Sequence, residues 1–279
     1  MNYIEVVIHT GIDSGELLGM LEGGEALGAW EASGAAHLFW PEDRWSPASL
    51  ADLKSALARL GAEVREGLIE VRTVPDQDWN AAWAASLQPI RLGRSFRVRQ
   101  SWHAPDPSFG GIELVIDPKR AFGTGYHATT QLVIRWLEDG IRGGERVLDA
   151  GTGSGILAMA AIRLGAASAL GIDNDPVAIE CAREYGSANG FGPELKLRVS
   201  SFEDVEGGFD VVVANLDIRT LPALCGHLPR LLKSGRIACL SGLQPQDFEE
   251  VAQALARAGL RIDSRDALDE WLALGIRRL

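Results

Sequence analysis

Residues 147–155 read Val-Leu-Asp-Ala-Gly-Thr-Gly-Ser-Gly, an apolar run that leads into three glycines at alternate positions. Glycine reaches backbone conformations that other residues avoid, and it lets a chain lie close against a ligand. A strand that ends in such a turn and continues as a helix is typical of sites for nucleotide-type cofactors. The stretch therefore predicts an α/β fold with a cofactor at a strand-to-helix turn.

The residues around this turn favour S-adenosylmethionine over a dinucleotide. Asp173 lies 22 residues after Gly151, close to the ~20-residue offset at which an acid reaches a ribose hydroxyl. The dinucleotide pattern G-x-G-x-x-G needs a third glycine where this chain has Ile156. A carboxylate beside the turn would repel a pyrophosphate, but it suits the cationic sulfonium and ammonium groups of S-adenosylmethionine. The residues predicted to bind this cofactor are therefore Asp149, Gly151, Gly153 and Asp173.

The composition limits the classes of protein to which the chain can belong. Its 279 residues suggest two domains, and 46% hydrophobic with 23% charged residues is enough for a sizeable core. No apolar run approaches the ~20 residues of a membrane span, and the first residues do not resemble a signal peptide. With 27 basic and 38 acidic residues, the net charge of −11 disfavours direct binding of nucleic acid and favours a basic partner.

The three cysteines, Cys181, Cys225 and Cys239, form no C-x-x-C pair and have no metal-ligand spacing. Reduced thiols in a cytoplasmic protein are the simplest account, and no metal site is predicted. Each cysteine is expected to pack as a small apolar side chain.

Residues 1–74 predict a small α+β domain. Apolar patterns indicate three strands and two helices, the strands at 3–8, 36–40 and 63–74 and the helices at 14–30 and from Ser49 to a stop at Gly61. This order suggests helices on one face of a sheet. The segment carries no catalytic constellation, so its expected role is substrate recognition.

Residues 75–98 are interpreted as a linker that contains a short helix. Trp79 and Trp83 lie four residues apart, on one face of that helix, and are expected to pack against the second domain rather than to contact substrate. The second domain is then expected to span residues 99–279.

Strands and helices are predicted to alternate in the second domain. Apolar runs lie at 146–150, 168–172, 195–199, 209–214 and 236–240, and helical stretches between and after them lie at 156–164, 176–189, 219–232 and 246–258. This alternation predicts a mostly parallel, doubly wound, Rossmann-like sheet with helices on both faces. Ligands of such sheets bind beyond the carboxyl ends of the strands, where Gly151, Asp173 and Asn215 fall.

A second motif, Ala-Phe-Gly-Thr-Gly-Tyr-His-Ala-Thr-Thr at 121–130, precedes the glycine turn, and Ala214-Asn215 follows it. These motifs resemble the PrmA family, the methyltransferases of large-subunit ribosomal protein L11. The resemblance spans most of the chain and includes Trp102, Asp117-Pro118 and Glu270-Trp271. It implies a class I S-adenosylmethionine-dependent methyltransferase fold, preceded by a domain that binds the ribosomal protein.

The same resemblance implies that Thr130, Gly151, Asp173 and Asn215 bind the cofactor. Thr130 stands at the start of a predicted helix, where its hydroxyl and free backbone N–H groups can meet the methionine carboxylate; simple N-capping is the alternative. Asn215 follows a buried strand and is predicted to orient the reacting amine, the alternative being a strand-end Asn that only satisfies turn backbone.

Four further residues are candidates on weaker grounds. The run Gly123-Thr124-Gly125 is interpreted as a lid over the cofactor or as an ordinary turn, which makes Thr124 a candidate contact. Phe122 flanks the cofactor or packs, and His127 accepts a proton or makes local contacts. In place of the mainly apolar residues that PrmA proteins typically have, this chain reads Leu216-Asp217-Ile218-Arg219-Thr220. Asp217 is then either solvated or a carboxylate for a cationic target.

The leading hypothesis is methylation of lysines of ribosomal protein L11. The alternatives are a methyltransferase that acts on another protein lysine, of the electron-transfer-flavoprotein type, and a module that binds the cofactor without catalysis. A nucleic-acid N-methyltransferase would usually place Pro-Pro-aromatic after Asn215 to grip a flipped base, and Leu216-Asp217-Ile218 stands there instead.

Overall fold

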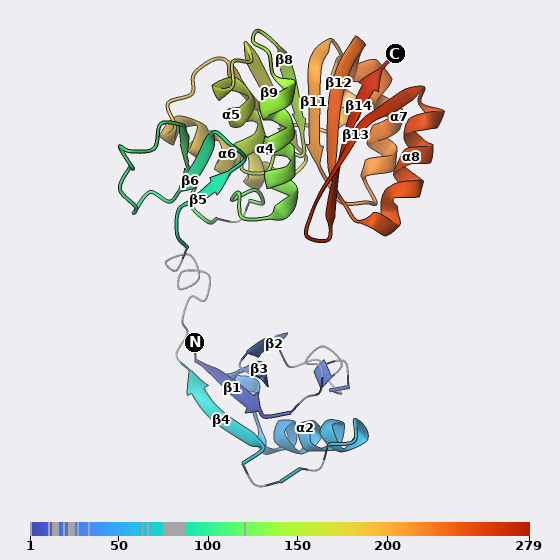
Figure 1. Cartoon of the computed structure of the whole chain (residues 1–279). Helices are drawn as coiled ribbons and strands as arrows, with labels where there is room; N and C mark the ends of the chain where they lie inside the picture. Colours follow the sequence, from blue (N-terminus) through green and yellow to red (C-terminus); the bar gives the residue numbers. More distant parts are fainter. Residues whose placement is uncertain are drawn as a thin grey trace. The chain divides into compact units, whose positions relative to one another are not determined.

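The chain forms two compact units, Met1–Ser86 and Leu87–Leu279 (Figure 1). The computed structural model describes residues 2–10, 12, 17–18, 20–21, 26, 28–32, 34–62, 64–65, 67–74, 87–119 and 121–279. The second unit begins earlier than the predicted boundary at residue 99, because short strands within 75–98 pack into its core. The predicted helix with Trp79 and Trp83 lies outside the described residues.

The first unit contains an antiparallel sheet with a helix packed against it. The strand order is β2-β3-β1-β4, with β1 at Tyr3–Ile8, β2 at Gly28–Ala32, β3 at Ala35–Pro41 and β4 at Ile69–Val74. Val6 and Ile8, alternate residues of β1, pack in one apolar cluster with Leu53 and Leu57 of helix α2, which spans Pro47–Arg59. The short 3-10 helix η1 (Glu42–Arg44) precedes α2.

The boundaries in this unit differ from the sequence prediction in three places. Helix α2 begins before Ser49, because the Ser46 hydroxyl caps it and Pro47 fits the first helical turn. The strand predicted from residue 63 is confined to β4, which follows Gly67 at φ +83°. Most of the helix predicted at 14–30 lies outside the described residues, and its last part, from Gly28, belongs to β2.

The second unit is built on a seven-stranded sheet. Its strand order is β10-β9-β8-β11-β12-β14-β13, and every strand except β14 runs in the same direction. The strands are β8 (Arg146–Ala150), β9 (Ser168–Asp173), β10 (Leu195–Val199), β11 (Phe209–Asn215), β12 (Leu232–Leu243), β13 (Leu260–Leu268) and β14 (Trp271–Arg278). The mostly parallel, doubly wound sheet that the sequence predicts is confirmed, and the β13–β14 hairpin is an addition to it.

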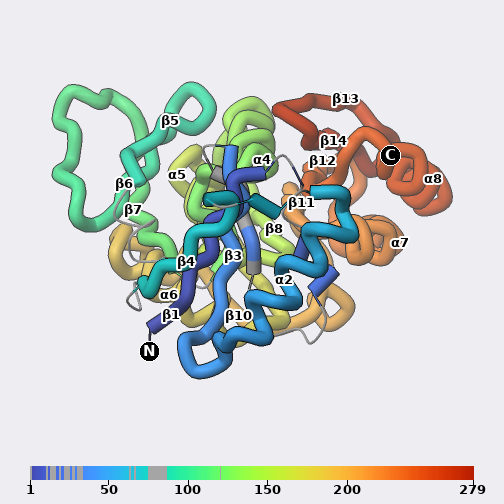
Figure 2. The backbone as a smooth tube through the Cα atoms, turned by 90° about the horizontal axis from the view of Figure 1, so that it is seen from below, coloured from blue at the N-terminus to red at the C-terminus, as the bar shows by residue number. Residues whose placement is uncertain are grey.

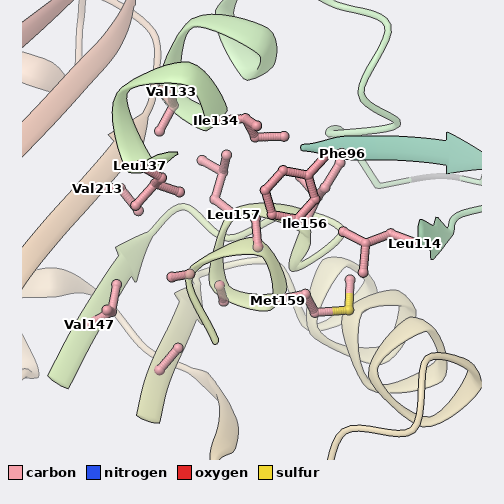
Figure 3. Close-up of a cluster of buried hydrophobic side chains, with 14 of the residues drawn as sticks. Phe96, Leu114, Val133, Ile134, Leu137, Val147, Ile156, Leu157, Met159 and Val213 are labelled. Carbon is pink, nitrogen blue, oxygen red and sulfur yellow. The ribbon is translucent and has the colours of Figure 1, made fainter. Parts of the chain in front are cut away.

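Helices cover both faces of this sheet, because its central strands are apolar on both sides. The helices are α4 (Ala128–Gly140), α5 (Ile156–Arg163), α6 (Pro176–Ala188), α7 (Leu221–Leu231) and α8 (Phe248–Arg257), with 3-10 turns η2 (Phe202–Asp204) and η3 (Pro245–Asp247). Val147 and Val213 pack with α4 and α5 (Figure 3), whereas their chain neighbours Leu148 and Val212 pack with α7 and α8. Among the described residues, no helix is long and apolar enough to cross a bilayer.

A small sheet, β5-β6-β7, packs against the helices on one face of the large sheet. It consists of β5 (Ile90–Leu92), β6 (Phe96–Arg99) and β7 (Ile112–Val115). Figures 1 and 2 show it at one end of the unit, while α7 and α8 lie together at the other end. The α4 residue Glu138, whose side chain is 2% exposed, holds the β5–β6 turn. Its carboxylate accepts the N–H groups of Arg94 at 2.9 Å and Ser95 at 2.6 Å.

We expect Glu138→Gln to lower the free energy of unfolding by about 1–3 kcal/mol, because a buried carboxylate that accepts backbone N–H groups is replaced by a neutral amide. Urea denaturation measures the change. The matched control is Asp139→Asn, which removes an exposed carboxylate 2.6 Å from the same Arg94 and should change stability less. Equal losses in the two variants would show that Glu138 does not fasten the turn.

Candidate active site

A cavity of about 660 Å³ lies at the carboxyl ends of β8, β9 and β11. Its walls come from the glycine loop (residues 151–155), the strap (residues 121–127), the ends of β9 and β11, and the start of β14. The predicted site residues that line it are Phe122, His127, Gly151, Gly153, Asp173, Asn215 and Asp217. Three others, Thr124, Thr130 and Asp149, are not among the described residues that line it.

Two positions of the glycine loop leave no space for a side chain. Gly151 has φ +75°, and a Cβ there would lie 2.2 Å from Cδ2 of Leu216. Gly153 has φ +53°, and a Cβ there would lie 2.5 Å from the backbone oxygen of Phe122. Both the left-handed conformation and the close approach therefore require glycine. These constraints let the loop, the strap and the β11 end meet at one edge of the sheet.

Asp173 fastens the glycine loop to the end of β9. Its Oδ2 accepts the N–H of Gly153 at 3.0 Å, and its Oδ1 accepts the N–H of Asp175 at 3.0 Å. The side chain lies at the cavity wall. A carboxylate held in this way presents its remaining lone pairs as fixed acceptors for hydroxyl donors.

Asp149 lies behind the glycine loop, whereas the sequence predicts that it faces the cofactor. The residue is fully buried, and its Oδ2 accepts the Thr152 hydroxyl at 2.6 Å and the Ala158 N–H at 3.1 Å. Its Oδ1 has no hydrogen-bond partner among the described residues. Burial disfavours the charged form more than these two hydrogen bonds favour it, so the pKa of Asp149 rises from its ordinary value of 3.8 to about 7.

The strap, which the sequence predicts to be either a lid or an ordinary turn, is tied to the glycine loop at two points. The N–H of Ser154 donates to the Phe122 carbonyl at 2.8 Å, and its hydroxyl donates to the Gly123 carbonyl at 2.6 Å. Thr124 is half-buried away from the cavity lining. Phe122 is 56% exposed and lies at the cavity wall, so the fixed backbone presents an accessible aromatic ring to the cavity.

Three rings form an aromatic wall of the cavity. The ring centre of His127 lies 5.3 Å from that of Phe122 and 5.1 Å from that of Trp271. His127 also caps α4, because its Nδ1 accepts the N–H of Thr129 at 3.3 Å and lies 2.8 Å from the Thr129 hydroxyl. In the neutral ring the proton then resides on Nε2, which makes that atom a donor and not a base.

Asn215 and Thr130 lie together at the carboxyl end of β11. The Asn215 amide Nδ2 donates to the Thr130 hydroxyl at 3.4 Å, and no described residue donates to its Oδ1. Thr130 is fully buried, and its chain neighbour Thr129 lines the cavity in its place. The structure therefore places Thr130 behind Asn215, whereas the sequence predicts a direct cofactor contact.

Asp217 lies at the cavity rim and begins the turn into α7. Its Oδ1 accepts the N–H groups of Arg219 at 2.9 Å and Thr220 at 3.1 Å. Burial opposes the charge, but the hydrogen bonds and the Arg219 guanidinium outweigh it and lower the pKa of Asp217. Its Oδ2 lies 3.4 Å from the Arg219 guanidinium, so both oxygens of this rim carboxylate are engaged within the turn.

Some residues that line the cavity were not predicted, because no motif in the sequence marks them individually. Ser200, Ser201 and Phe202 follow β10, and Asn174 follows β9. Their strand-end positions could have identified them, because the ends of parallel strands meet at one edge of the sheet. Trp271 reaches the cavity from the hairpin that the apolar runs did not reveal. The described residues include no group of three or more His, Cys, Asp or Glu that could hold a metal.

Comparison with known proteins identifies the family. The family model of ribosomal protein L11 methyltransferase (PrmA) matches residues 37–278. The chain belongs to this family. A ribosomal protein L11 methyltransferase of Pelobacter propionicus is 36% identical over 249 residues, which cover 86% of this chain and 80% of the relative. That of Pseudomonas paraeruginosa is 39% identical over 219 residues, 78% of this chain and 73% of the relative.

A solved structure agrees with this assignment. The crystal structure of ribosomal protein L11 methylase from Lactobacillus delbrueckii subsp. bulgaricus matches with a TM-score of 0.66 and 34% sequence identity. The match covers 69% of this chain and 99% of that chain. The second unit therefore has the class I methyltransferase fold.

We expect Gly153→Ala to weaken uptake of S-adenosylmethionine about tenfold or more, because the new Cβ would displace the Phe122 carbonyl from the loop. Calorimetry measures the affinity. Gly190→Ala is the matched control, since Gly190 also has positive φ (+70°) but no atom within 4 Å of an added Cβ. Equal affinities in the two variants would contradict a role for the close approach.

The pKa of Asp149 predicts a pH dependence of stability without added S-adenosylmethionine. Because the pKa of Asp149 is higher in the folded than in the unfolded chain, the contribution of this residue to stability is fully present below about pH 4 and is lost as the pH rises to about 7. Relative to Asp149→Asn, the wild type should lose about 2–3 kcal/mol between about pH 5 and about pH 8. Urea denaturation across this range measures it, and parallel pH curves would contradict the raised pKa.

Proposed function

We propose that this chain transfers methyl groups from S-adenosylmethionine to lysine amino groups of ribosomal protein L11. Membership of the ribosomal protein L11 methyltransferase family supports this proposal. The observation that carries it is the meeting, around one cavity, of the glycine loop, Asp173 and Asn215. Binding residues and a polar group suited to an amine are thereby combined in one site.

The residues around the cavity fit the proposed methyl donor. Gly151 and Gly153 offer backbone without side chains, and Asp173 offers carboxylate oxygens suited to ribose hydroxyls. Oδ1 of Asp149 is a buried acceptor without a partner among the described residues, next to the loop that would face a cation. When bound, S-adenosylmethionine supplies a methyl carbon that its sulfonium already activates. The chain then has to align the amine and exclude water.

A lysine amine must lose its proton before it can react. With an ordinary pKa of about 10.4, deprotonation near pH 7.4 costs roughly 4 kcal/mol. Apolar walls lower this cost because they disfavour the charged ammonium, and Phe122, Trp271 and Leu216 supply such walls. A strong base is then optional, which agrees with an Nε2 of His127 that already carries its proton.

In this proposal Asn215 orients the amine. Its Nδ2 is engaged by Thr130, so the amide is held with Oδ1 available to accept a hydrogen of the amine. Asp217 stands further out and attracts a cationic side chain toward the rim. His127 forms part of the aromatic wall, and its Nε2–H is available as a hydrogen-bond donor.

The net charge and the state of the cysteines support the proposed partner and compartment. A net charge of −11 favours a basic protein over direct contact with nucleic acid. Cys181, Cys225 and Cys239 are buried and free, which suits a reducing cytoplasm. A different protein lysine is the second candidate target, because the polar turn from Asp217 departs from the apolar stretch of the family.

The test is to incubate the protein with isotope-labelled S-adenosylmethionine and an extract of a strain that lacks this gene. Mass spectrometry then identifies the labelled protein. Label on ribosomal protein L11 supports the proposal, and label only on another protein supports the second candidate. Donor uptake without any label would indicate a cofactor-binding module.

Within this assay, we expect Asn215→Ala to lower turnover at least about tenfold while donor affinity changes less, because the lost amide acts on the amine. Asp217→Asn is the comparison at the rim: it should raise KM for the protein substrate while kcat is largely retained, because it removes a charge that attracts the substrate and not a group that orients the amine. Equal losses of donor affinity and turnover in Asn215→Ala would assign Asn215 to the donor instead.

A further inference from the structure

Tyr126 lies in the strap next to His127 of the cavity wall, yet its side chain reaches the start of the second unit. Its hydroxyl donates to the backbone carbonyl of Gln88 and accepts the Gln100 Nε2–H at 3.0 Å. Gln88 is the second residue of this unit. The strap is therefore hydrogen-bonded to the point where the chain passes from the first unit to the second.

The anchor (residues 87–88) is held by a second side chain. His103 Nε2 lies 2.9 Å from the carbonyl oxygen of Leu87, within hydrogen-bond distance. Gln100, which orients the Tyr126 hydroxyl, is fully buried, and its Oε1 lacks a partner among the described residues. A buried amide with an unpaired oxygen is destabilising, and the hydrogen bond to the Tyr126 hydroxyl satisfies the other end of this amide.

On its other side, Tyr126 is continuous with the cavity wall. Its carbonyl accepts the Gln131 Nε2–H of α4 at 3.1 Å, and the next residue, His127, caps α4 and belongs to the aromatic wall. A Cβ on the preceding Gly125 would lie 3.0 Å from Leu92 of β5. The strap thus has little space to shift without a change at Tyr126.

We propose that Tyr126 is a positioning residue that couples the anchor to the cavity wall. Seating of the anchor holds the strap in place, and a ligand that fixes the strap holds the anchor in return, because such coupling is reciprocal. The inference rests on the proposed function, since it takes S-adenosylmethionine as the ligand.

Amide hydrogen exchange with and without S-adenosylmethionine tests the coupling in the full chain. In the wild type, the donor should slow exchange in the peptide 87–92 about fivefold, the effect of one net hydrogen bond. Tyr126→Phe should abolish this slowing. Gln100→Leu, which removes the orienting donor, should reduce it.

The matched control is Tyr185→Phe. Tyr185 also donates its hydroxyl to a backbone carbonyl, that of Asp117, but it contacts neither the strap nor the anchor by this bond. It should retain the full slowing. Slowing that persists in Tyr126→Phe, or that is absent from a wild type that takes up the donor by calorimetry, would overturn the inference. A folded wild type without any donor uptake would overturn the proposed function, and this inference with it.

Discussion

The close approach of the strap to the glycine loop is the constraint on which the site depends. The Phe122 carbonyl sits where a side chain at position 153 would lie, and it accepts the Ser154 N–H. Gly151 and Gly242 likewise have no room for a side chain, because Leu216 lies too close to both. Because these positions lack side chains, three segments distant in sequence meet at one edge of the sheet and enclose the cavity.

Two acidic side chains stabilise this arrangement in different ways. Asp173 is at the cavity wall and holds the tip of the loop through the Gly153 N–H. Asp149 is fully buried behind the loop, where it holds the Thr152 hydroxyl and the start of α5. A buried carboxylate is costly unless it is paired. Burial raises the pKa of Asp149, and its Oδ1 has no hydrogen-bond partner among the described residues.

The parallel sheet could be predicted because strands buried on both faces contain continuous apolar runs, such as 211–214. The β13–β14 hairpin is missing from the prediction. Although β14 carries a buried apolar run, its partner β13 is largely exposed and lacks one. The position of the cavity could be predicted from the ends of the strands, but the directions of its side chains could not. Asp149 and Thr130 are close in sequence to residues that line the cavity, yet both lie behind it. The direction of a side chain depends on how distant segments pack together, and the sequence does not show which segments meet.

The most direct measurement is calorimetric titration of the wild type and of Asp173→Ala with S-adenosylmethionine and, separately, with NAD. S-adenosylmethionine is expected to bind the wild type at one site, about tenfold or more weaker in the variant, with no uptake of NAD. Uptake of NAD in place of S-adenosylmethionine, or the same affinity in Asp173→Ala as in the wild type, would contradict the assignment of the cavity.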